Sequence, residues 1–342
     1  MKVTIYDRIP YPSAPLPRTH PHFLGGLALQ YGLDVPDSVR VLDIGCGAGR
    51  NLAWIAATVA GASCIGVDVA ATAIADAQAF AARIEIANVR FVHADFLETP
   101  AGEFDYIVAN GLYSWIPADA RAALLRFIDE RLSPQGVAFV SFHEELRPWR
   151  SRLLRIDDPL DRLETAKSQV PELAEFDDGL LLHDALADIS EPVTVAEFEA
   201  ALPTGLAYLC DSRGPAEALP DFHEAVVVRA GRVAGEPLFD KMWFVTEASY
   251  PATVEDCEDT VVEVYSGPRQ IVSEAGQYPV AWAPAQILAR DGDREILNYF
   301  GAVVELEEDD RAIFVSLDGT RSRDEFPAET LEFFAKAGLL ES

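Results

Sequence analysis

VRVLDIGCGAGRNLAWIAATVA, residues 39–60, is the stretch that decides the fold. The apolar run at 39–44 is typical of a buried strand, and the alanine-rich stretch at 50–60 is typical of a helix. Between them lie Gly45, Gly47 and Gly49. Glycine has no Cβ, so a turn built from it lets the backbone approach a ligand closely. The stretch therefore predicts a ligand-binding turn between a strand and a helix.

The spacing of these glycines limits the class of ligand. A dinucleotide fingerprint starting at Gly45 needs a third glycine at position 50, where this chain has Arg50, and no Gly-Lys-Ser/Thr follows for a P-loop. Asp43, two residues before the first glycine, would repel a pyrophosphate. A carboxylate in this place can instead hold the ammonium end of a cofactor that carries an amino acid.

Strand-like and helix-like segments alternate beyond this turn. Strands buried on both faces that alternate with helices indicate a doubly wound, mostly parallel α/β sheet. The predicted strands are SCIGVDVA (63–70), NVRFVHADF (88–96), FDYIVAN (104–110) and VAFVSFH (137–143), and the predicted helices are 71–83 and 118–132.

The alternation breaks after residue 145. Residues 146–201 are predicted to be a helical insertion on the substrate side, and strands at 205–211 and 224–231 could complete the same sheet. The Gly/Pro break AGEPLFD (234–240) marks a boundary. We therefore expect an N-terminal arm or lid (1–22), a main domain (23–233) and an acidic C-terminal domain (234–342).

Composition and charge exclude several classes of protein. The chain has 342 residues, 49% of them apolar, and a net charge of −29, so it is a poor candidate for binding nucleic-acid phosphates. Four scattered cysteines form no disulfide framework. The N-terminus has no apolar signal core, and no run approaches the ~18 apolar residues of a membrane span. We expect a cytoplasmic protein that binds neither nucleic acid nor membrane.

The D-x-G-x-G-x-G pattern from Asp43 resembles motif I of the class I S-adenosylmethionine (SAM) methyltransferases. The resemblance implies a Rossmann-like fold, SAM as cofactor, and later elements in a set order, ending with a turn at 132–136 before the fifth strand. It implies that Asp68 binds the ribose hydroxyls, that Asp95-Phe96 meets the adenine amino group, and that Asn110-Gly111 lies where substrate is met. The implied cofactor-binding residues are Asp43, Gly45, Gly47, Gly49, Asn51, Asp68, Asp95, Phe96 and Asn110.

Further segments resemble one branch of that superfamily, which includes rickettsial-type protein-lysine methyltransferases. They are YPSAPLPRTHP (11–21), NGLYSWIP (110–117), and a stretch at 182–209 similar to the methyltransferase regulatory domain. LDGTRSR (317–323) resembles part of a winged-helix-like α+β C-terminal domain. The chain departs from that group at Asn110, where His is usual, and in a shorter middle region.

The segment after the fourth strand supplies the candidate catalytic residues Asn110, Tyr113 and Trp115. Asn110 offers a side-chain carbonyl, and the two aromatic rings offer π faces that attract an ammonium. Alternatively, Tyr113 and Trp115 are core aromatics under the sheet edge. Tyr11 and His20 are candidates for a lid over SAM, although His20 could instead anchor the arm through hydrogen bonds.

No metal site is expected. His143, Glu144 and Glu145 are adjacent on a strand end, and side chains that alternate between faces cannot all reach one ion.

These features predict a SAM-dependent methyltransferase that acts on a protein or peptide side chain, with the lysine amine as acceptor. In this interpretation the C-terminal domain recognises or positions the substrate. One alternative is a small-molecule or peptide-natural-product N- or O-methyltransferase. The other is a SAM-binding regulatory or scaffold protein without catalysis.

Overall fold

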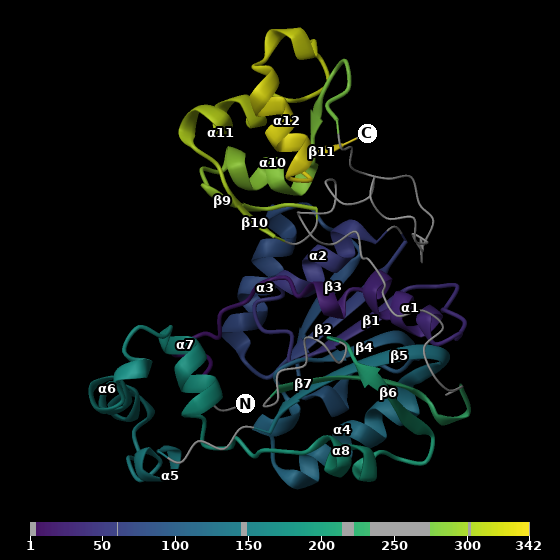
Figure 1. Cartoon of the computed structure of the whole chain (residues 1–342), viewed down its shortest axis with the longest axis vertical. Coiled ribbons are helices and arrows are strands. Elements are labelled where there is room, and N and C mark those ends of the chain that lie inside the picture. The colour runs from purple at the N-terminus through teal and green to yellow at the C-terminus, as the bar shows by residue number, and fades with distance from the viewer. Residues whose placement is uncertain are drawn as a thin grey trace.

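A mostly parallel sheet forms the centre of the protein (Figure 1). The computed structural model describes residues 5–59, 61–144, 149–213, 222–232, 274–299 and 302–341. The strand order is β3-β2-β1-β4-β5-β7-β6, and β7 runs antiparallel to both of its neighbours. The predicted doubly wound α/β fold is confirmed, with the two later strands in the same sheet. The strands are β1 (Arg40–Ile44), β2 (Ser63–Asp68), β3 (Val89–His93), β4 (Phe104–Ala109), β5 (Leu132–His143), β6 (Leu206–Asp211) and β7 (Phe222–Arg229).

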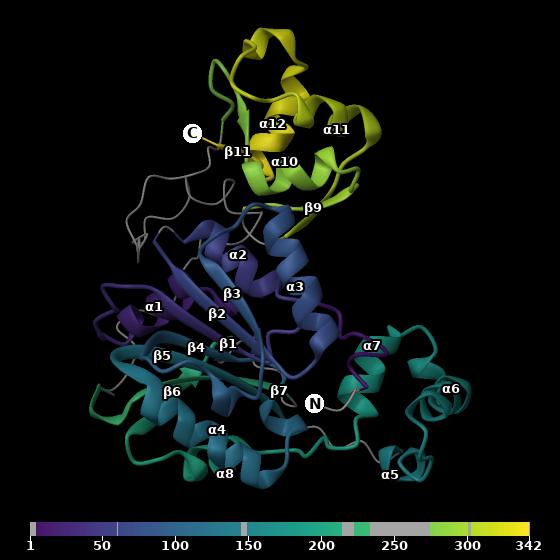
Figure 2. The ribbon, with the colours of Figure 1, turned by 180° about the vertical axis from the view of Figure 1, so that it is seen from behind.

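Helices cover both faces of the sheet (Figure 2). One face carries α1 (Pro21–Gln30), α2 (Arg50–Thr58) and α3 (Ala71–Arg83), and the other carries α4 (Ala118–Arg131) and α8 (Val195–Ala201). Along β1, Val41 belongs to the core beneath α1 and α2, whereas Leu42 and Ile44 belong to the core beneath α4. Because side chains alternate along a strand, an uninterrupted apolar strand supplies both cores.

Two element boundaries differ from the prediction. β5 begins at Leu132, so the residues of the expected turn at 132–136 belong to the strand. Leu132 pairs with Phe104 of β4, a register shift follows before Val137, and the Ser133 hydroxyl donates to Asp105 at 2.9 Å. α1 begins at Pro21, inside the predicted arm, because proline is well tolerated at the first helical position.

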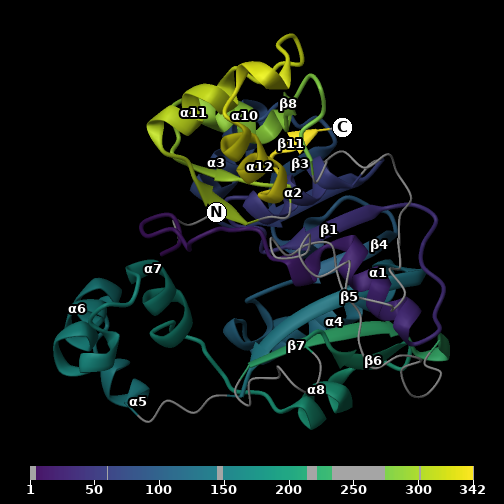
Figure 3. The ribbon, with the colours of Figure 1, turned by 45° about the horizontal axis from the view of Figure 1, so that its top comes forward.

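Most of the insertion after β5 lies beside the N-terminal segment, whereas its last helix, α8, lies on the sheet (Figure 3). It contains α5 (Arg150–Leu153), α6 (Pro159–Gln169), a 3-10 turn η4 (Pro171–Leu173) and α7 (Asp178–Leu180), which continues into the π-helical turn η5 (Leu181–Ala185). The helical prediction therefore holds for most of the described insertion, whereas 186–194 is not helical. Ile5 and Ile9 of the arm pack against the insertion's own small core.

The described C-terminal residues form an α+β unit that packs on α2 and α3. The Trp54 indole N–H donates to the Tyr299 carbonyl at 2.9 Å, and Arg83 pairs with Asp291 and Asp293. The predicted boundary at 234–240 lies outside the described residues. The unit contains β8 (Val280–Ala281), α10 (Ala283–Arg290), β9 (Glu295–Leu297), β10 (Val303–Glu305), α11 (Glu308–Val315), η9 (Arg323–Glu325), α12 (Ala328–Lys336) and β11 (Leu340–Glu341).

Candidate functional site

The turn after β1 has left-handed backbone at all three glycines, with φ of +75° at Gly45, +53° at Gly47 and +71° at Gly49. A Cβ added to Gly49 would lie 2.6 Å from the Phe91 ring, so this glycine is needed for packing. A Cβ on Gly47 would meet no atom of the described residues within 4 Å, apart from its own chain neighbours. The turn therefore has one glycine packed against the protein and one that borders open space.

Asp68 is fixed against the same turn. Its carboxylate accepts the Gly47 N–H at 2.9 Å on one oxygen and the Ala70 N–H at 2.8 Å on the other. Burial raises the pKa of Asp68, and these backbone hydrogen bonds partly oppose the rise. Each carboxylate oxygen keeps a further lone pair for a hydroxyl donor.

Asp43 lies buried beneath the turn, with 5% of its surface exposed. Burial, with a smaller contribution from the charge of Asp68, raises the pKa of Asp43 to about 7, against a hydrogen bond from Asn51 that lowers it. An ammonium group beside Asp43 would stabilise its ionised form.

Asn51 and His20 both hold the arm. The Leu16 N–H donates to the Asn51 carbonyl oxygen at 2.8 Å, and the Asn51 amide donates to Thr19 at 3.0 Å. His20 caps α1 by accepting the His22 N–H, and its other ring nitrogen lies 2.9 Å from the Thr58 hydroxyl. Burial lowers its pKa. Because Thr58 is at the far end of α2 from the glycine turn, the structure places His20 as an anchor of the arm rather than as a lid.

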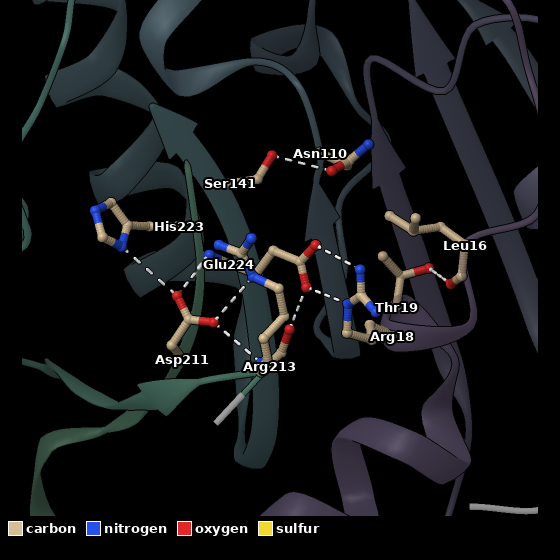
Figure 4. A network of polar contacts seen from close by, with 10 residues as sticks. Leu16, Arg18, Thr19, Asn110, Ser141, Asp211, Arg213, His223 and Glu224 are labelled. Carbon is tan, nitrogen blue, oxygen red and sulfur yellow. Dashed lines mark hydrogen bonds and ion pairs between the residues drawn. The ribbon is translucent and has the colours of Figure 1, made fainter. Parts of the chain in front are cut away.

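An ion pair joins the arm to β7 (Figure 4). Arg18 donates through Nε at 2.6 Å and through Nη2 at 3.2 Å to the two oxygens of Glu224, whose side chain is 5% exposed. Ser212 also donates to Glu224. No local sequence pattern predicts this pair; a lone glutamate beside the run of Ala and Val at 225–228 is the available signal.

A second polar contact at this edge links β4 and β5 (Figure 4). The Ser141 hydroxyl donates to the Asn110 side-chain oxygen at 3.0 Å and accepts the Gly111 N–H at 2.7 Å. Ser141 and Glu224 are paired across β5 and β7. Asn110 is therefore at the carboxyl edge, as predicted, but its carbonyl oxygen is turned to a residue that the sequence analysis did not single out.

The two candidate aromatic residues have different environments. Tyr113 is 4% exposed, and its ring packs 5.2 Å from Phe198 and 6.1 Å from Phe142. Tyr113 is therefore a core aromatic residue, the alternative given above, and its ring does not face an open site. Trp115 is partly exposed, and its indole N–H donates to the Asp184 carbonyl at 3.1 Å.

Tyr11 and the adjacent arm residues contact the insertion. The Tyr11 hydroxyl, on a residue 40% exposed, donates to the Asp184 carboxylate at 3.3 Å. Burial and the charge of Asp184 raise its pKa. Tyr6 stacks on His183 with ring centroids 4.0 Å apart. The arm therefore reaches from the start of α2 to the insertion along the edge of the sheet.

The predicted adenine pair follows β3. Asp95 is exposed, and one of its oxygens accepts the Leu97 N–H at 2.9 Å. The Phe96 ring packs edge-on against Phe127 at 5.6 Å. The described residues contain no cluster of three or more His, Cys, Asp or Glu that could hold a metal ion. None of the helices within the described ranges is long and apolar enough to cross a membrane.

Comparison with known proteins assigns this arrangement to a family. Residues 41–136, from β1 into β5, match the family described as a methyltransferase domain. The fold matches PKMT2 from Rickettsia typhi, solved also with AdoHcy, with a TM-score of 0.72 over 96% of this chain and 100% of that chain at 18% identity. The chain therefore contains a methyltransferase domain with the fold of the class I SAM-dependent enzymes. The TM-score shows that this methyltransferase and PKMT2 share a fold, and SAM is the cofactor that such a domain implies.

Relatives in sequence cover the methyltransferase to different extents. The uncharacterized protein RP028 of Rickettsia prowazekii is 28% identical over 220 residues, which are 54% of this chain and 88% of RP028. A trans-aconitate 2-methyltransferase of Deinococcus radiodurans is 35% identical over 101 residues, 30% of this chain and 36% of that protein. The matched region of the methyltransferase therefore covers about a third of the Deinococcus enzyme's length.

The residues present fit SAM. A cofactor with an ammonium and a ribose needs one carboxylate beneath the glycine turn and a second carboxylate that accepts hydrogen bonds from the ribose hydroxyls. It also needs open space over the turn. Asp43, Asp68 and the Cβ-free surface of Gly47 provide these features within one edge of the sheet.

Proposed function

We propose that this methyltransferase transfers the methyl group of SAM to the side-chain amine of a lysine in a protein or peptide. The observation that carries the proposal is the negative charge at the carboxyl edge of the sheet, where Asp68 and Asp184 both lie close enough to raise the pKa of Tyr6 in the arm. A lysine is a cation until it is deprotonated, so such an edge attracts it. The net charge of −29 acts in the same direction on encounter.

In this proposal six of the predicted cofactor residues contact SAM. Asp43 holds the ammonium of SAM, Asp68 accepts both ribose hydroxyls, and Asp95 with Phe96 meets the adenine. The backbone at Gly45 and Gly47 lies against the cofactor. The arm (1–22) and the insertion (146–201) flank the acceptor beside the main domain (23–233), and the unit within 234–342 supports α2 and α3.

The chain's part in the chemistry is to orient the reactants and exclude water. Bound SAM supplies an electrophilic methyl group on its sulfonium. A lysine amine has an unperturbed pKa of ~10.4, so it must lose a proton before it can attack. Desolvation lowers that pKa. The arm and the insertion, joined by the Tyr11–Asp184 hydrogen bond, would exclude water from the acceptor amine. The partly exposed Trp115 ring would offer a π face to the lysine ammonium.

A small acid is the second candidate acceptor, because trans-aconitate 2-methyltransferases are among the relatives. An anionic acceptor needs cations around it. Of the arginines that flank this edge in the described residues, Arg18 is paired with Glu224, and Arg50 lies 3.7 Å from the centre of the Phe80 ring. The charges at the edge therefore favour lysine, as does the resemblance to protein-lysine methyltransferases and to the protein named PKMT2.

The test is a transfer assay with tritium-labelled SAM and a cell lysate separated into macromolecular and small-molecule fractions. We expect label in the protein fraction, and a large loss of label with Asp68→Ala. Label confined to the small-molecule fraction would refute a protein acceptor. Label that persists with Asp68→Ala would refute the proposed cofactor site.

A further inference from the structure

Ser141 places a hydroxyl inside an apolar strand. Its neighbours along β5, Val140 and Phe142, are fully buried, and Ser141 itself has no exposed surface. A buried hydroxyl needs both a donor and an acceptor nearby, because each unmet hydrogen bond costs free energy. What the hydroxyl contacts therefore indicates why serine stands there.

In the part of the chain that the structure describes, the Ser141 hydroxyl has two partners, both at the end of β4. The Gly111 N–H donates to the oxygen at 2.7 Å, which leaves the hydroxyl proton in need of an acceptor. The Asn110 side-chain oxygen is that acceptor, at 3.0 Å. Ser141 thus connects the backbone turn at Gly111 to the amide of Asn110.

This chain of hydrogen bonds has only one consistent direction. If the Asn110 amide were turned over, its NH2 group would face the Ser141 oxygen and the buried hydroxyl proton would lose its acceptor. The carbonyl oxygen of Asn110 must therefore face Ser141, and the NH2 group faces away from it, as drawn in Figure 4.

We propose that Ser141 is a positioning residue that aims the NH2 group of Asn110 at the carboxyl edge, where it donates a hydrogen bond to a carboxylate or carbonyl oxygen of a ligand. Asn110 is exposed, so its side chain contacts the ligand. Ser141 is buried, so it acts by fixing which end of the Asn110 amide faces that ligand. The oxygen belongs either to the carboxylate of SAM or to the main chain of the acceptor.

The polarity changes the expected role of Asn110. An attacking amine uses its lone pair to form the new N–C bond, so a hydrogen-bond donor aimed at that lone pair would oppose the reaction. Asn110 therefore holds an oxygen of one reactant rather than the amine nitrogen. The inference rests on the proposed function only where the acceptor supplies that oxygen.

Ser133 provides a matched control on the same strand. It is also buried, and its hydroxyl donates to the Asp105 side chain at 2.9 Å, but it lies at the opposite end of β5. Ser141→Ala and Ser133→Ala each remove one buried hydroxyl from β5. We expect the two variants to lose comparable stability. A larger effect of Ser141→Ala on binding would therefore come from the place of Ser141 beside Asn110 and not from the loss of a buried hydroxyl.

The experiment measures the SAM dissociation constant by calorimetry, and the concentration of the labelled protein fraction that gives half-maximal transfer. Asn110→Asp keeps the shape of the side chain but removes both donors and adds a negative charge. We expect Asn110→Asp to weaken either SAM or the acceptor by about tenfold or more, the usual effect of leaving a charged partner unmatched. Ser141→Ala should weaken the same reactant by a smaller factor, and Ser133→Ala neither.

A raised SAM dissociation constant assigns the oxygen to SAM. A raised half-saturating concentration of the acceptor, with unchanged SAM affinity, assigns the oxygen to the acceptor. Unchanged values for both reactants with Asn110→Asp would overturn the inference, as would equal effects of Ser141→Ala and Ser133→Ala. If no protein fraction is methylated, the lysine proposal fails separately. The SAM titration then decides alone, and an unchanged affinity overturns the inference.

Discussion

Two glycines of the same turn are expected to differ in what an alanine substitution costs, with stability the larger effect at Gly49 and SAM binding the larger effect at Gly47. Gly49 and Gly47 both have left-handed backbone, which costs a non-glycine residue about 1–2 kcal/mol. At Gly49 the new methyl would also lie 2.6 Å from the Phe91 ring and 2.7 Å from the Ala77 Cβ. Overpacking of this kind costs a further ~1–3 kcal/mol. Gly49→Ala should therefore lose about 3 kcal/mol of stability, and Gly47→Ala about 1 kcal/mol.

SAM binding should rank the two variants differently. The Gly47 methyl would enter space that no other described residue approaches within 4 Å, which is the space that we assign to the cofactor. Gly47→Ala should therefore stay folded and weaken SAM by at least about tenfold, equivalent to ~1.4 kcal/mol. Urea unfolding and calorimetric titration of both variants give the two numbers. Wild-type SAM affinity in a folded Gly47→Ala protein would refute the placement of the cofactor.

Three further perturbations test individual contacts. Asp68→Ala should weaken SAM by ~1–3 kcal/mol, because the ribose hydroxyls would lose their acceptors, and unchanged affinity would refute this role. The pKa of Asp43 is raised to about 7 in the folded protein, above its unfolded value, so the contribution of Asp43 to stability falls as pH rises from about 4 to 7. SAM binding should tighten over the same range, because the SAM ammonium favours ionised Asp43, and below about pH 7 binding should release the Asp43 proton. Titrations in buffers of different ionisation enthalpy should show this proton release, and Asp43→Asn should abolish it. Arg18→Met should cost about 2 kcal/mol in urea unfolding, between the values for exposed and buried pairs, and a Glu224→Gln background should reduce that cost; an undiminished cost would show that the two side chains are not coupled.

Local signals are enough to predict the sheet and to bring Asp43 and Asp68 to one edge of it. The apolar strands, the helices between them and the glycine turn carry their information within a few residues, so β1 through β5 were found in order. The order of carboxylates along the chain also placed Asp43 and Asp68 at one edge, because the carboxyl ends of parallel strands meet there.

Contacts between distant segments could not be predicted in the same way. Arg18 and Glu224 are far apart in sequence, and no local pattern pairs an arm residue with the β7 strand. Tyr113 was ambiguous because an aromatic residue after a strand can line a site or fill the core, and only the packing of Phe142 and Phe198 around it distinguishes the two. His20 is ambiguous in the sequence for the same reason, and only the Thr58 hydroxyl beside its ring distinguishes an anchor from a lid.

The most direct test of the account is the chemical identity of the methylated atom. The labelled protein fraction would be split, with one half treated with alkali and the other hydrolysed in acid for amino-acid analysis. An N-methyl bond survives both treatments, so the account predicts alkali-stable label that elutes as methylated lysine. Label released by alkali as methanol would identify a methyl ester, and would contradict an amine acceptor at this edge of the sheet.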